Sequence, residues 1–311
     1  MSFFARNILM IMFAVRPILV LADNGLMVAG PNFAVPATQQ IRFVALSKID
    51  PKLYQHPLIP KEIDLRKFQS KVKLQGARGA CTYFVITSLV ESLIKKQTGI
   101  EVDLSEEYLA WSAKTKLKLR PLEEDSSVVV NALAIQETGF MYEDELPYQQ
   151  SWFDEGLPCA GKKGSAKIDP VCYSHSGPKP DQAKNIKRGN FVEFRDIGSS
   201  SLEVVKEIAS LRVPVTVSIL AHQEMWDASR KSGNLFLTES AKKACGLNPK
   251  LCTGHAALII GYNLKRKVFY LKNSWGESWG DKGYGTIPFE YLDQMSDRRF
   301  LVGKVVGAIK L

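Results

Sequence analysis

The sequence predicts an α+β fold in which a helical half precedes a half built mainly of antiparallel strands. From Cys81 to Gly99, apolar residues recur at the spacing of a buried helix. Beyond Val213, short apolar runs alternate with turn residues, as in strands joined by hairpins. Residues 154–190, between the two halves, are rich in Gly, Pro, Lys and Ser, which is typical of an inserted surface loop.

The N-terminal segment has the pattern of a secretion signal. Arg6 precedes the apolar run Ile8–Val15, and Ala22 is a small residue of the kind found before a cleavage site. We therefore interpret residues 1–22 as a signal peptide and expect a secreted or periplasmic protein. No other segment reaches transmembrane length, so no stable membrane span is expected after cleavage. Residues 23–59 are loop-like and read as a short pro-segment or an N-terminal arm.

Further elements follow from periodicity and from cap and turn residues. Beyond the helix that starts at Cys81, we expect helices over Ser105–Ala113, Ser127–Thr138 and Leu202–Leu211. Strands are expected over four apolar runs, Val213–Leu220, Ala256–Tyr262, Val268–Asn273 and Tyr284–Ile287. No internal repeat is present.

The charge distribution favours solubility over nucleic-acid binding. The formal net charge is +9, but the 41 basic residues are scattered and are not interleaved with aromatic residues. One local exception runs from Lys114 to Arg120, where basic residues alternate with other residues. In an extended segment this alternation places four charges on one side, and we expect a solvated edge there in preference to an anion-binding site.

The chain has five cysteines, and an odd number in an exported protein indicates disulfides with one thiol left over. Cys159 and Cys172 flank one short loop, and Cys245 and Cys252 flank another. These pairs are disulfide candidates, which leaves Cys81 free. The alternative is that Cys81 is a buried inert thiol and that the other four are reduced.

Cys81 stands at the start of its predicted helix, where unsatisfied amides and the helix dipole favour a thiolate. A cysteine at a helix start is more often structural, but its neighbours favour catalysis. Gly76 and Gly79 permit a close approach of the backbone, and Gln75 can direct an amide donor to the same point as the Cys81 N–H. Convergent donors of this kind form an oxyanion hole.

His255 and Asn273 complete the candidate site. His255 opens an apolar strand, and Asn273 ends the next strand eighteen residues later. A histidine beside such a strand is usually a satisfied core residue. Here adjoining hairpin strands can bring the Asn273 amide oxygen to one imidazole nitrogen, which leaves the other nitrogen for the thiol.

These segments resemble those of papain and the cathepsins. The stretch Gln75–Cys81 resembles the oxyanion-glutamine and nucleophile segment of that family, Thr253–Tyr262 its histidine strand, and Tyr270–Gly285 its asparagine segment. The order Gln, Cys, His, Asn is also that of the family. The resemblance extends from about Pro60 to Ile287 and implies a papain-like peptidase domain over residues 60–311.

The resemblance implies a two-domain architecture and a role for each site residue. The helical half, about residues 60–150, and the β-rich half, about 191–311, would flank a cleft. The implied catalytic residues are Cys81, His255 and Asn273, with Gln75 as the oxyanion donor. The residues implied to line the substrate cleft are Trp275, which also shields the histidine–asparagine pair, and Thr253, Ala256 and Ser218.

The chain departs from the family pattern beside the nucleophile. Thr82 stands where the family usually has tryptophan, and Arg78 stands where it usually has cysteine. The partner cysteine and its Gly-Gly pair are also absent near Asp125–Ser127. Because both halves of that disulfide are missing together, these changes indicate a divergent subfamily.

The predicted function is a cysteine-type endopeptidase that acts on proteins or peptides through a thioester, with no metal and no organic cofactor. The loop between Cys159 and Cys172 has no His-His pair, which favours endopeptidase over carboxydipeptidase activity. Two alternatives remain on the same scaffold: a catalytically silent binding protein, and a transamidase or peptide ligase.

Overall fold

The computed structural model describes residues 59–121, 123–150, 159–161, 170–174, 177–187, 192–198, 200–247, 252–296 and 300–306. All of them belong to one unit of the chain, Ile41–Leu311. The predicted signal peptide and, apart from Ile59, the predicted pro-segment lie outside the described residues.

Three α-helices form the first part of the fold: α1 (Cys81–Thr98), α2 (Glu106–Trp111) and α3 (Val128–Thr138). Helix α1 is buried on nearly all sides and ends at Gly99, whose φ of 75° is in the left-handed region. Ser105 and Ser127 cap α2 and α3 through their side chains, as their positions in the sequence predict. All three predicted helices are confirmed.

The solvated edge expected over Lys114–Arg120 is only partly present, because Lys116 and Lys118 are exposed but the segment is not extended and Lys114 is buried. Residues Ser112–Lys116 continue α2 as a π-helical turn, and Arg120 has a positive φ of 49°. Lys114 is 1% exposed, and its Nζ donates to the backbone carbonyls of Arg120 and Asp125 at 3.2 and 3.0 Å. Because the turn points this ammonium inward at carbonyl oxygens, the alternation does not place it in solvent.

An antiparallel sheet forms the second part of the fold, and its strand order is β2-β7-β3-β4-β5-β6, with β1 pairing separately with β4. The strands are β1 (Glu62–Asp64), β2 (Val192–Asp196), β3 (Val215–His222), β4 (Cys252–Asn263), β5 (Val268–Lys272), β6 (Tyr284–Pro288) and β7 (Leu301–Val305). Strand β1 approaches β4 closely at Gly261, where a Cβ would lie 2.1 Å from the Ile63 carbonyl oxygen. Only glycine fits at this crossing.

Further helices follow or connect the strands. The predicted helix over Leu202–Leu211 is confirmed as α4 (Ser201–Leu211). The sequence reading missed α5 (Gln223–Ser232), α6 (Glu239–Leu247) and α7 (Phe289–Met295). Short 3-10 turns cover Arg66–Phe68, Pro170–Tyr173 and Ala183–Asn185.

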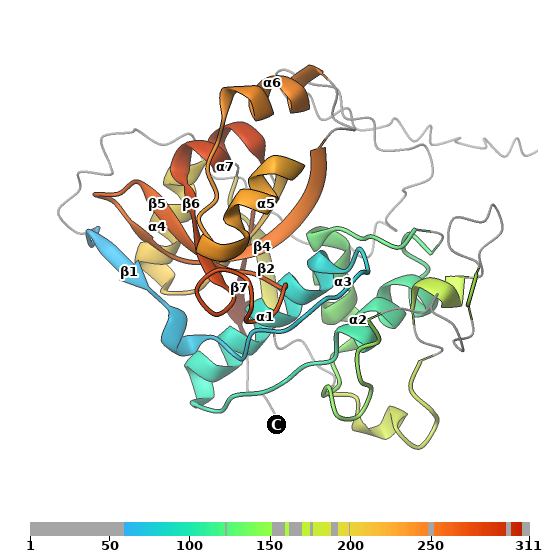
Figure 1. Cartoon of the computed structure of the whole chain (residues 1–311). Helices are drawn as coiled ribbons and strands as arrows, with labels where there is room; N and C mark the ends of the chain where they lie inside the picture. Colours follow the sequence, from blue (N-terminus) through green and yellow to red (C-terminus); the bar gives the residue numbers. More distant parts are fainter. Residues whose placement is uncertain are drawn as a thin grey trace, which may run out of the picture. The chain divides into compact units, whose positions relative to one another are not determined.

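Helix α1 packs against the sheet, so that one apolar core joins the two parts (Figure 1). At Gly303 in β7, a Cβ would lie 2.8 Å from Leu93 of α1, which shows how closely the helix approaches. The α+β prediction is confirmed. In the part of the chain that the structure describes, no helix has the length and apolar character needed to cross a bilayer.

Candidate functional site

Cys81 is the first residue of α1 and is partly exposed. It is the free cysteine of the chain. Burial raises the pKa of its thiol, while the backbone N–H groups of Ala256 and Thr82 interact with the sulfur and act in the opposite direction. Since Ala256 follows His255 in β4, the contact with its N–H brings the sulfur to the histidine strand.

His255 is held by Asn273 across two adjacent strands. The His255 Nε2 lies 2.8 Å from the Asn273 Oδ1, and both side chains are buried. The same oxygen accepts from the backbone N–H of Ser274 at 2.8 Å. Because an amide oxygen can only accept, Nε2 carries the proton and Nδ1 is the nitrogen left to exchange one.

Three tryptophans surround this pair. The Trp275 ring lies 4.7 Å from the imidazole centroid, and the Trp226 ring lies edge-on to the imidazole at 5.1 Å. Trp226 also contacts Trp275, and Trp279 lies behind Trp275. These rings exclude water from the imidazole, so burial lowers the pKa of His255 to about 4 although its bond to Asn273 acts in the opposite direction.

Gln75 is buried and bonded at both ends of its amide. Its Nε2 donates to the Arg78 carbonyl at 3.0 Å, and its Oε1 accepts from the Ser274 hydroxyl at 2.6 Å. The Gln75 backbone N–H donates to the Ser274 carbonyl at 2.8 Å, so the loop before α1 is tied to the segment after β5. One amide hydrogen of Nε2 remains beyond the bond to Arg78.

Three of the four predicted cleft residues lie along β3 and β4, and Trp275 follows β5. Ser218 pairs with Ala256, and Thr253 pairs with Ala221 near the end of both strands. Thr253 is exposed and Ser218 is partly buried, whereas Ala256 is 2% exposed. Ala256 therefore acts on this region through its backbone more than through its side chain.

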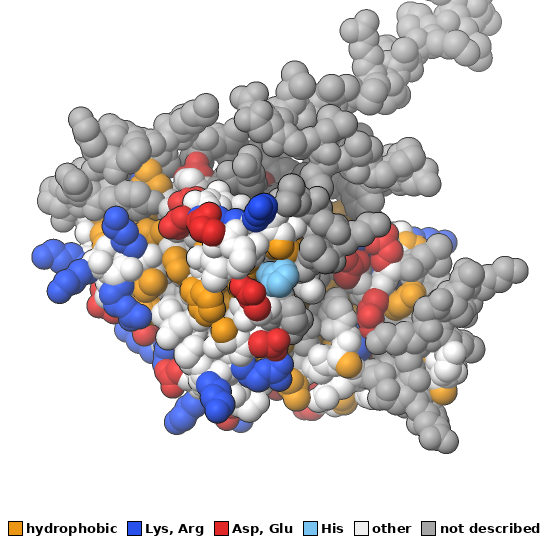
Figure 2. Space-filling model, turned by 45° about the horizontal axis from the view of Figure 1, so that its top comes forward, with side chains coloured by type: hydrophobic (Ala, Val, Ile, Leu, Met, Phe, Trp, Pro, Cys, Tyr) orange, Lys and Arg blue, Asp and Glu red, His pale blue; other side chains and the backbone are white. Residues whose placement is uncertain are grey.

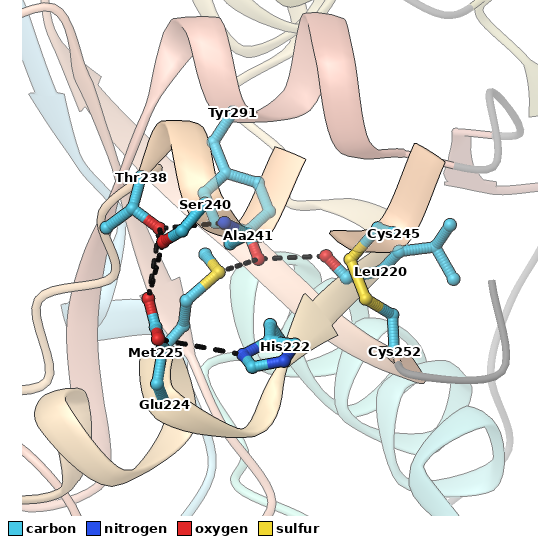
Figure 3. Close-up of a disulfide and its surroundings, with 10 residues drawn as sticks. All are labelled: Leu220, His222, Glu224, Met225, Thr238, Ser240, Ala241, Cys245, Cys252 and Tyr291. Atoms are coloured by element: carbon cyan, nitrogen blue, oxygen red, sulfur yellow. Dashed lines mark hydrogen bonds and ion pairs between the residues drawn. A yellow bond between two sulfur atoms is a disulfide. The ribbon is translucent and has the colours of Figure 1, made fainter. Parts of the chain in front are cut away.

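Both predicted disulfides are present, Cys159–Cys172 and Cys245–Cys252. The second joins α6 to the first residue of β4, three residues before His255. Figure 3 shows it beside the Tyr291 hydroxyl, which donates to the Leu220 carbonyl of β3 at 2.9 Å. The disulfide and this bond fix the end of the paired strands β3 and β4, the second of which carries the histidine.

The sequence patterns did not predict a charged network behind the site, in which Glu91 and Glu106 are buried and Asp103 is exposed. Lys73 Nζ contacts the carboxylates of Glu91, Asp103 and Glu106 at 2.8, 2.6 and 2.9 Å. Burial raises the pKa of Glu106 to about 7 against the attraction of Lys73.

Lys272, next to Asn273, donates to the backbone and hydroxyl oxygens of Ser70 at 3.0 and 2.9 Å. Contacts of Lys73 and Lys272 therefore support both the Gln75 loop and β5.

The unusual residues beside Cys81 are accommodated by hydrogen bonds. Thr82 is buried, and its hydroxyl accepts from Asn131 Nδ2 of α3 at 3.0 Å. Asn131 Oδ1 in turn accepts from Ser126 at 2.7 Å. This chain of bonds links the first turn of α1 to the segment where the family glycines are missing.

Other missed residues are Ser274 and Trp226. Ser274 directly follows Asn273 in a segment that the sequence singled out, so its position was visible but its bond to Gln75 was not. Trp226 lies in the missed helix α5, where only Met225, Trp226 and Ser229 supply a weak buried stripe.

The family follows from comparison with known proteins. Residues 59–294 match the profile described as "Papain family cysteine protease". The chain belongs to this family. Its relatives include Peptidase 1 of Psoroptes ovis, 26% identical over 232 residues, and mouse cathepsin K, 25% identical over 236 residues. These matches cover 73% and 74% of this chain and 60% of each relative, so the chain spans about three fifths of their lengths.

Solved structures of this papain-family type share the fold. Xylellain from Xylella fastidiosa aligns with a TM-score of 0.64 at 20% identity, over 84% of this chain and 91% of that one. Digestive procathepsin L 3 of Tenebrio molitor aligns at 0.58 and 22% identity, over 86% and 74%. Bromelain of Ananas comosus aligns at 0.54 and 20% identity, over 80% and 100%. These neighbours establish the papain-like α+β fold.

Among the residues that the structure describes, no group of His, Cys, Asp and Glu is arranged to hold a metal ion. On the face seen in Figure 2, basic and acidic side chains lie interspersed over the part that is described.

Proposed function

We propose that the protein is a cysteine-type endopeptidase that cleaves peptide bonds through a thioester on Cys81. The observation that carries the proposal is the 2.8 Å contact between His255 Nε2 and Asn273 Oδ1. The residue after His255, Ala256, directs its backbone N–H to the Cys81 sulfur, so the histidine and the thiol lie close together. The contact with Asn273 orients the imidazole and leaves Nδ1 for the thiol. Membership of the papain family of cysteine proteases supports the same chemistry.

In the acylation half, His255 Nδ1 takes the thiol proton and the Cys81 thiolate attacks the carbon of the scissile carbonyl. The carbonyl electron pair moves to oxygen, where the free amide hydrogen of Gln75 and the Cys81 backbone N–H donate to it. The C–N bond then breaks, and the imidazolium of His255 gives its proton to the leaving amine.

In the deacylation half, His255 takes a proton from water, and the resulting hydroxide attacks the thioester carbon. The C–S bond breaks, the carboxylic product leaves, and the thiol is restored by the proton on the imidazole. One water molecule is added across the peptide bond in total. The steps use no metal and no organic cofactor.

The electrostatics favour a pair of charges over either charge alone. Burial raises the pKa of Cys81 and lowers that of His255 to about 4, so each group by itself prefers its neutral form. A thiolate and an imidazolium formed together attract each other in the same buried place. The N–H groups of Ala256 and Thr82 and the start of α1 further stabilise the thiolate.

We assign the substrate cleft to Trp275, Thr253, Ala256 and Ser218. Trp275 is partly exposed beside the imidazole, which suits the leaving-group side of the bond. Ser218 pairs with Ala256, whose backbone N–H interacts with the Cys81 sulfur, which supports placing both residues beside the proposed nucleophile. Small residues at these two positions leave room for a side chain of moderate size.

Labelling of the non-reduced protein with an epoxysuccinyl inhibitor, followed by peptide mapping, tests this function. We expect one adduct, on Cys81, and loss of both adduct and peptide hydrolysis in Cys81→Ser. Hydrolysis at the parental rate in Cys81→Ser would overturn the nucleophile assignment. Absence of labelling, before and after removal of residues up to Ile59, would instead favour the binding-protein alternative. Amine-dependent product formation without net hydrolysis would identify a transamidase or ligase.

We further propose that the protein is exported by residues 1–22 and that residues 23–59 form an inhibitory pro-segment of the peptidase domain 60–311. The two disulfides support an oxidising compartment. Cleavage at the end of the pro-segment should raise peptidase activity. Full activity of the uncut protein would exclude the inhibitory role.

A further inference from the structure

Arg78 belongs to the loop before α1, and its buried side chain contacts three other segments of the chain. Its side chain is 4% exposed, and Nη1 donates to the Glu107 carboxylate of α2 at 2.5 Å and to the Gln149 carbonyl at 2.6 Å. Nη2 donates to the carbonyl of Tyr173 at 2.9 Å. The guanidinium also faces the Tyr148 ring, 4.9 Å from its centroid. One side chain thus joins the loop before α1 to parts of the chain that are distant in sequence.

A buried ion pair of this kind is not explained by stability alone. Glu107 is fully buried, and its carboxylate raises the pKa of Arg78 against burial, which acts to lower it. Replacement of a buried ion pair by well-packed apolar residues is often neutral or stabilising. The arrangement of directional bonds around Arg78 is therefore better explained by the position that it imposes on the loop.

The same residue reaches the oxyanion donor through its backbone. The Arg78 carbonyl accepts from Gln75 Nε2 at 3.0 Å and from the Ala80 N–H at 2.8 Å. Tyr148, whose ring faces the guanidinium, donates its hydroxyl to the Gln75 carbonyl at 2.9 Å. A shift of Arg78 would move the carbonyl that orients the Gln75 amide and the tyrosine that holds its backbone.

The Arg78 guanidinium also contacts the residue next to the Cys159–Cys172 disulfide. Tyr173, which accepts from Nη2, directly follows Cys172, and both disulfide cysteines are 1% exposed. This bond connects the residue after Cys172 to the loop before α1 through one side chain and one backbone carbonyl.

We propose that Arg78 is a positioning residue of the oxyanion hole, which it couples to the Cys159–Cys172 disulfide. The inference rests on the proposed peptidase function. Arg78 acts through Gln75 and does not touch the substrate. Its loss therefore weakens stabilisation of the oxyanion and leaves the thiol itself intact.

The test compares reactions that do and do not form an oxyanion. Arg78→Lys keeps the charge but not the forked geometry, and we expect kcat for a peptide substrate and affinity for a peptide aldehyde to fall about tenfold or more. Alkylation of Cys81 by iodoacetamide forms no oxyanion, so its rate should stay within about twofold. Arg195→Lys is the matched control, because Arg195 pairs with Glu207 at 2.6 Å on β2 and α4.

A second variant guards against misfolding. Arg78→Met combined with Glu107→Leu removes both charges together, which preserves folding better than removal of one partner. It should show the same loss of kcat and aldehyde affinity with Cys81 alkylation retained. Parental kcat in this variant and in Arg78→Lys would overturn the inference, as would an equal loss of alkylation. If the wild type itself hydrolyses no peptide, the proposed function and this inference fall together; if it does, only the inference is at stake.

The coupling is tested by a double-mutant cycle. Replacement of Cys159 and Cys172 by serine should lower kcat in the same direction as Arg78→Lys. Because both changes act on one chain of contacts, the combined variant should lose less than the product of the separate losses. Losses that multiply would show that the disulfide and Arg78 act independently.

Discussion

The hydroxyl of Ser274 donates to the side-chain oxygen of Gln75 over 2.6 Å, although the two residues lie 199 positions apart in the chain. The bond joins the residue after Asn273 to the residue proposed to stabilise the oxyanion. It also fixes the orientation of the Gln75 amide, because its oxygen accepts from Ser274 and its nitrogen donates to Arg78. The segment that contains Asn273 and the proposed oxyanion donor Gln75 are thus joined by hydrogen bonds through Ser274.

Ser274→Ala should reduce turnover more than substrate binding. The change removes one buried neutral hydrogen bond, worth about 1 kcal/mol, so we expect kcat to fall roughly fivefold with little change in KM. Steady-state kinetics on a peptide substrate measure the effect. Ser201→Ala is a suitable control, since Ser201 is also buried and its hydroxyl donates to Asp293 at 2.9 Å, between α4 and α7 and not to a site residue. An equal loss of kcat in the control would remove the special role of Ser274.

His255→Ala should make Cys81 an ordinary buried thiol. Without the imidazolium, burial keeps the thiol pKa above its usual value of 9.0. Alkylation by iodoacetamide at pH 7 should therefore be about tenfold slower than in the parent, or slower still, and should recover only as the pH rises past 9. A pH profile of the alkylation rate checks this. An unchanged profile would mean that His255 does not activate the thiol.

Cys81→Ala should reveal the intrinsic titration of His255. Burial lowers the pKa of this imidazole from 6.5 to about 4, so the folded protein favours its neutral form. The stability contributed by the neutral imidazole is fully present above pH 6.5 and is lost as the pH falls towards 4. The loss amounts to roughly 3 kcal/mol, at about 1.4 kcal/mol per tenfold change in proton affinity.

Urea unfolding of Cys81→Ala between pH 7 and pH 4 measures this loss. The matched control is Cys81→Ala combined with His255→Gln, which lacks the titrating ring but keeps all other ionisable groups. The pH dependence of the first variant should exceed that of the control by the stated amount. Parallel curves would show that His255 does not titrate at a lowered pKa.

Removal of the Cys245–Cys252 disulfide should destabilise the end of β4. The two cysteines are seven residues apart, and closing so short a loop contributes about 2 kcal/mol by restricting the unfolded chain. Replacement of both by serine should lower the free energy of unfolding by that amount. Cys81 labelling should persist, because β3 and β5 still hold β4 on both sides. Loss of labelling would show that the disulfide itself positions His255.

The segments nearest the site were the most predictable from sequence. The helix that starts at Cys81 and the strands that carry His255 and Asn273 have strong apolar patterns, and all three are confirmed with small changes of boundary. The catalytic roles of these residues remain predictions. The path from Ser274 to Gln75 was not predictable, because it depends on tertiary pairing and has no local pattern.

Weaker patterns explain the missed elements. Strand β2 (Val192–Asp196) carries three charged residues in five, and β7 has Gly303 and Lys304 within five residues. Both strands join the sheet through pairing with segments that are distant in the sequence. Strand β2 pairs with β7, and β7 also pairs with β3. The prediction for Lys114 was wrong for the opposite reason. A regular alternation of basic residues predicted an exposed side chain in an extended segment, but a π-helical turn and backbone carbonyl partners bury it.

Strand β4 has a consequence for the making of the protein. It holds His255, and it pairs with β3 before it, with β5 after it, and with β1 near the start of the domain. A growing chain therefore exposes the thiol of Cys81 long before its base exists, and the base is seated only when early and late segments have met. On the proposed function, the catalytic site is therefore assembled only after β4 and β5 have been synthesised and β4 has paired with β1, and removal of the inhibitory pro-segment follows as a separate, later step.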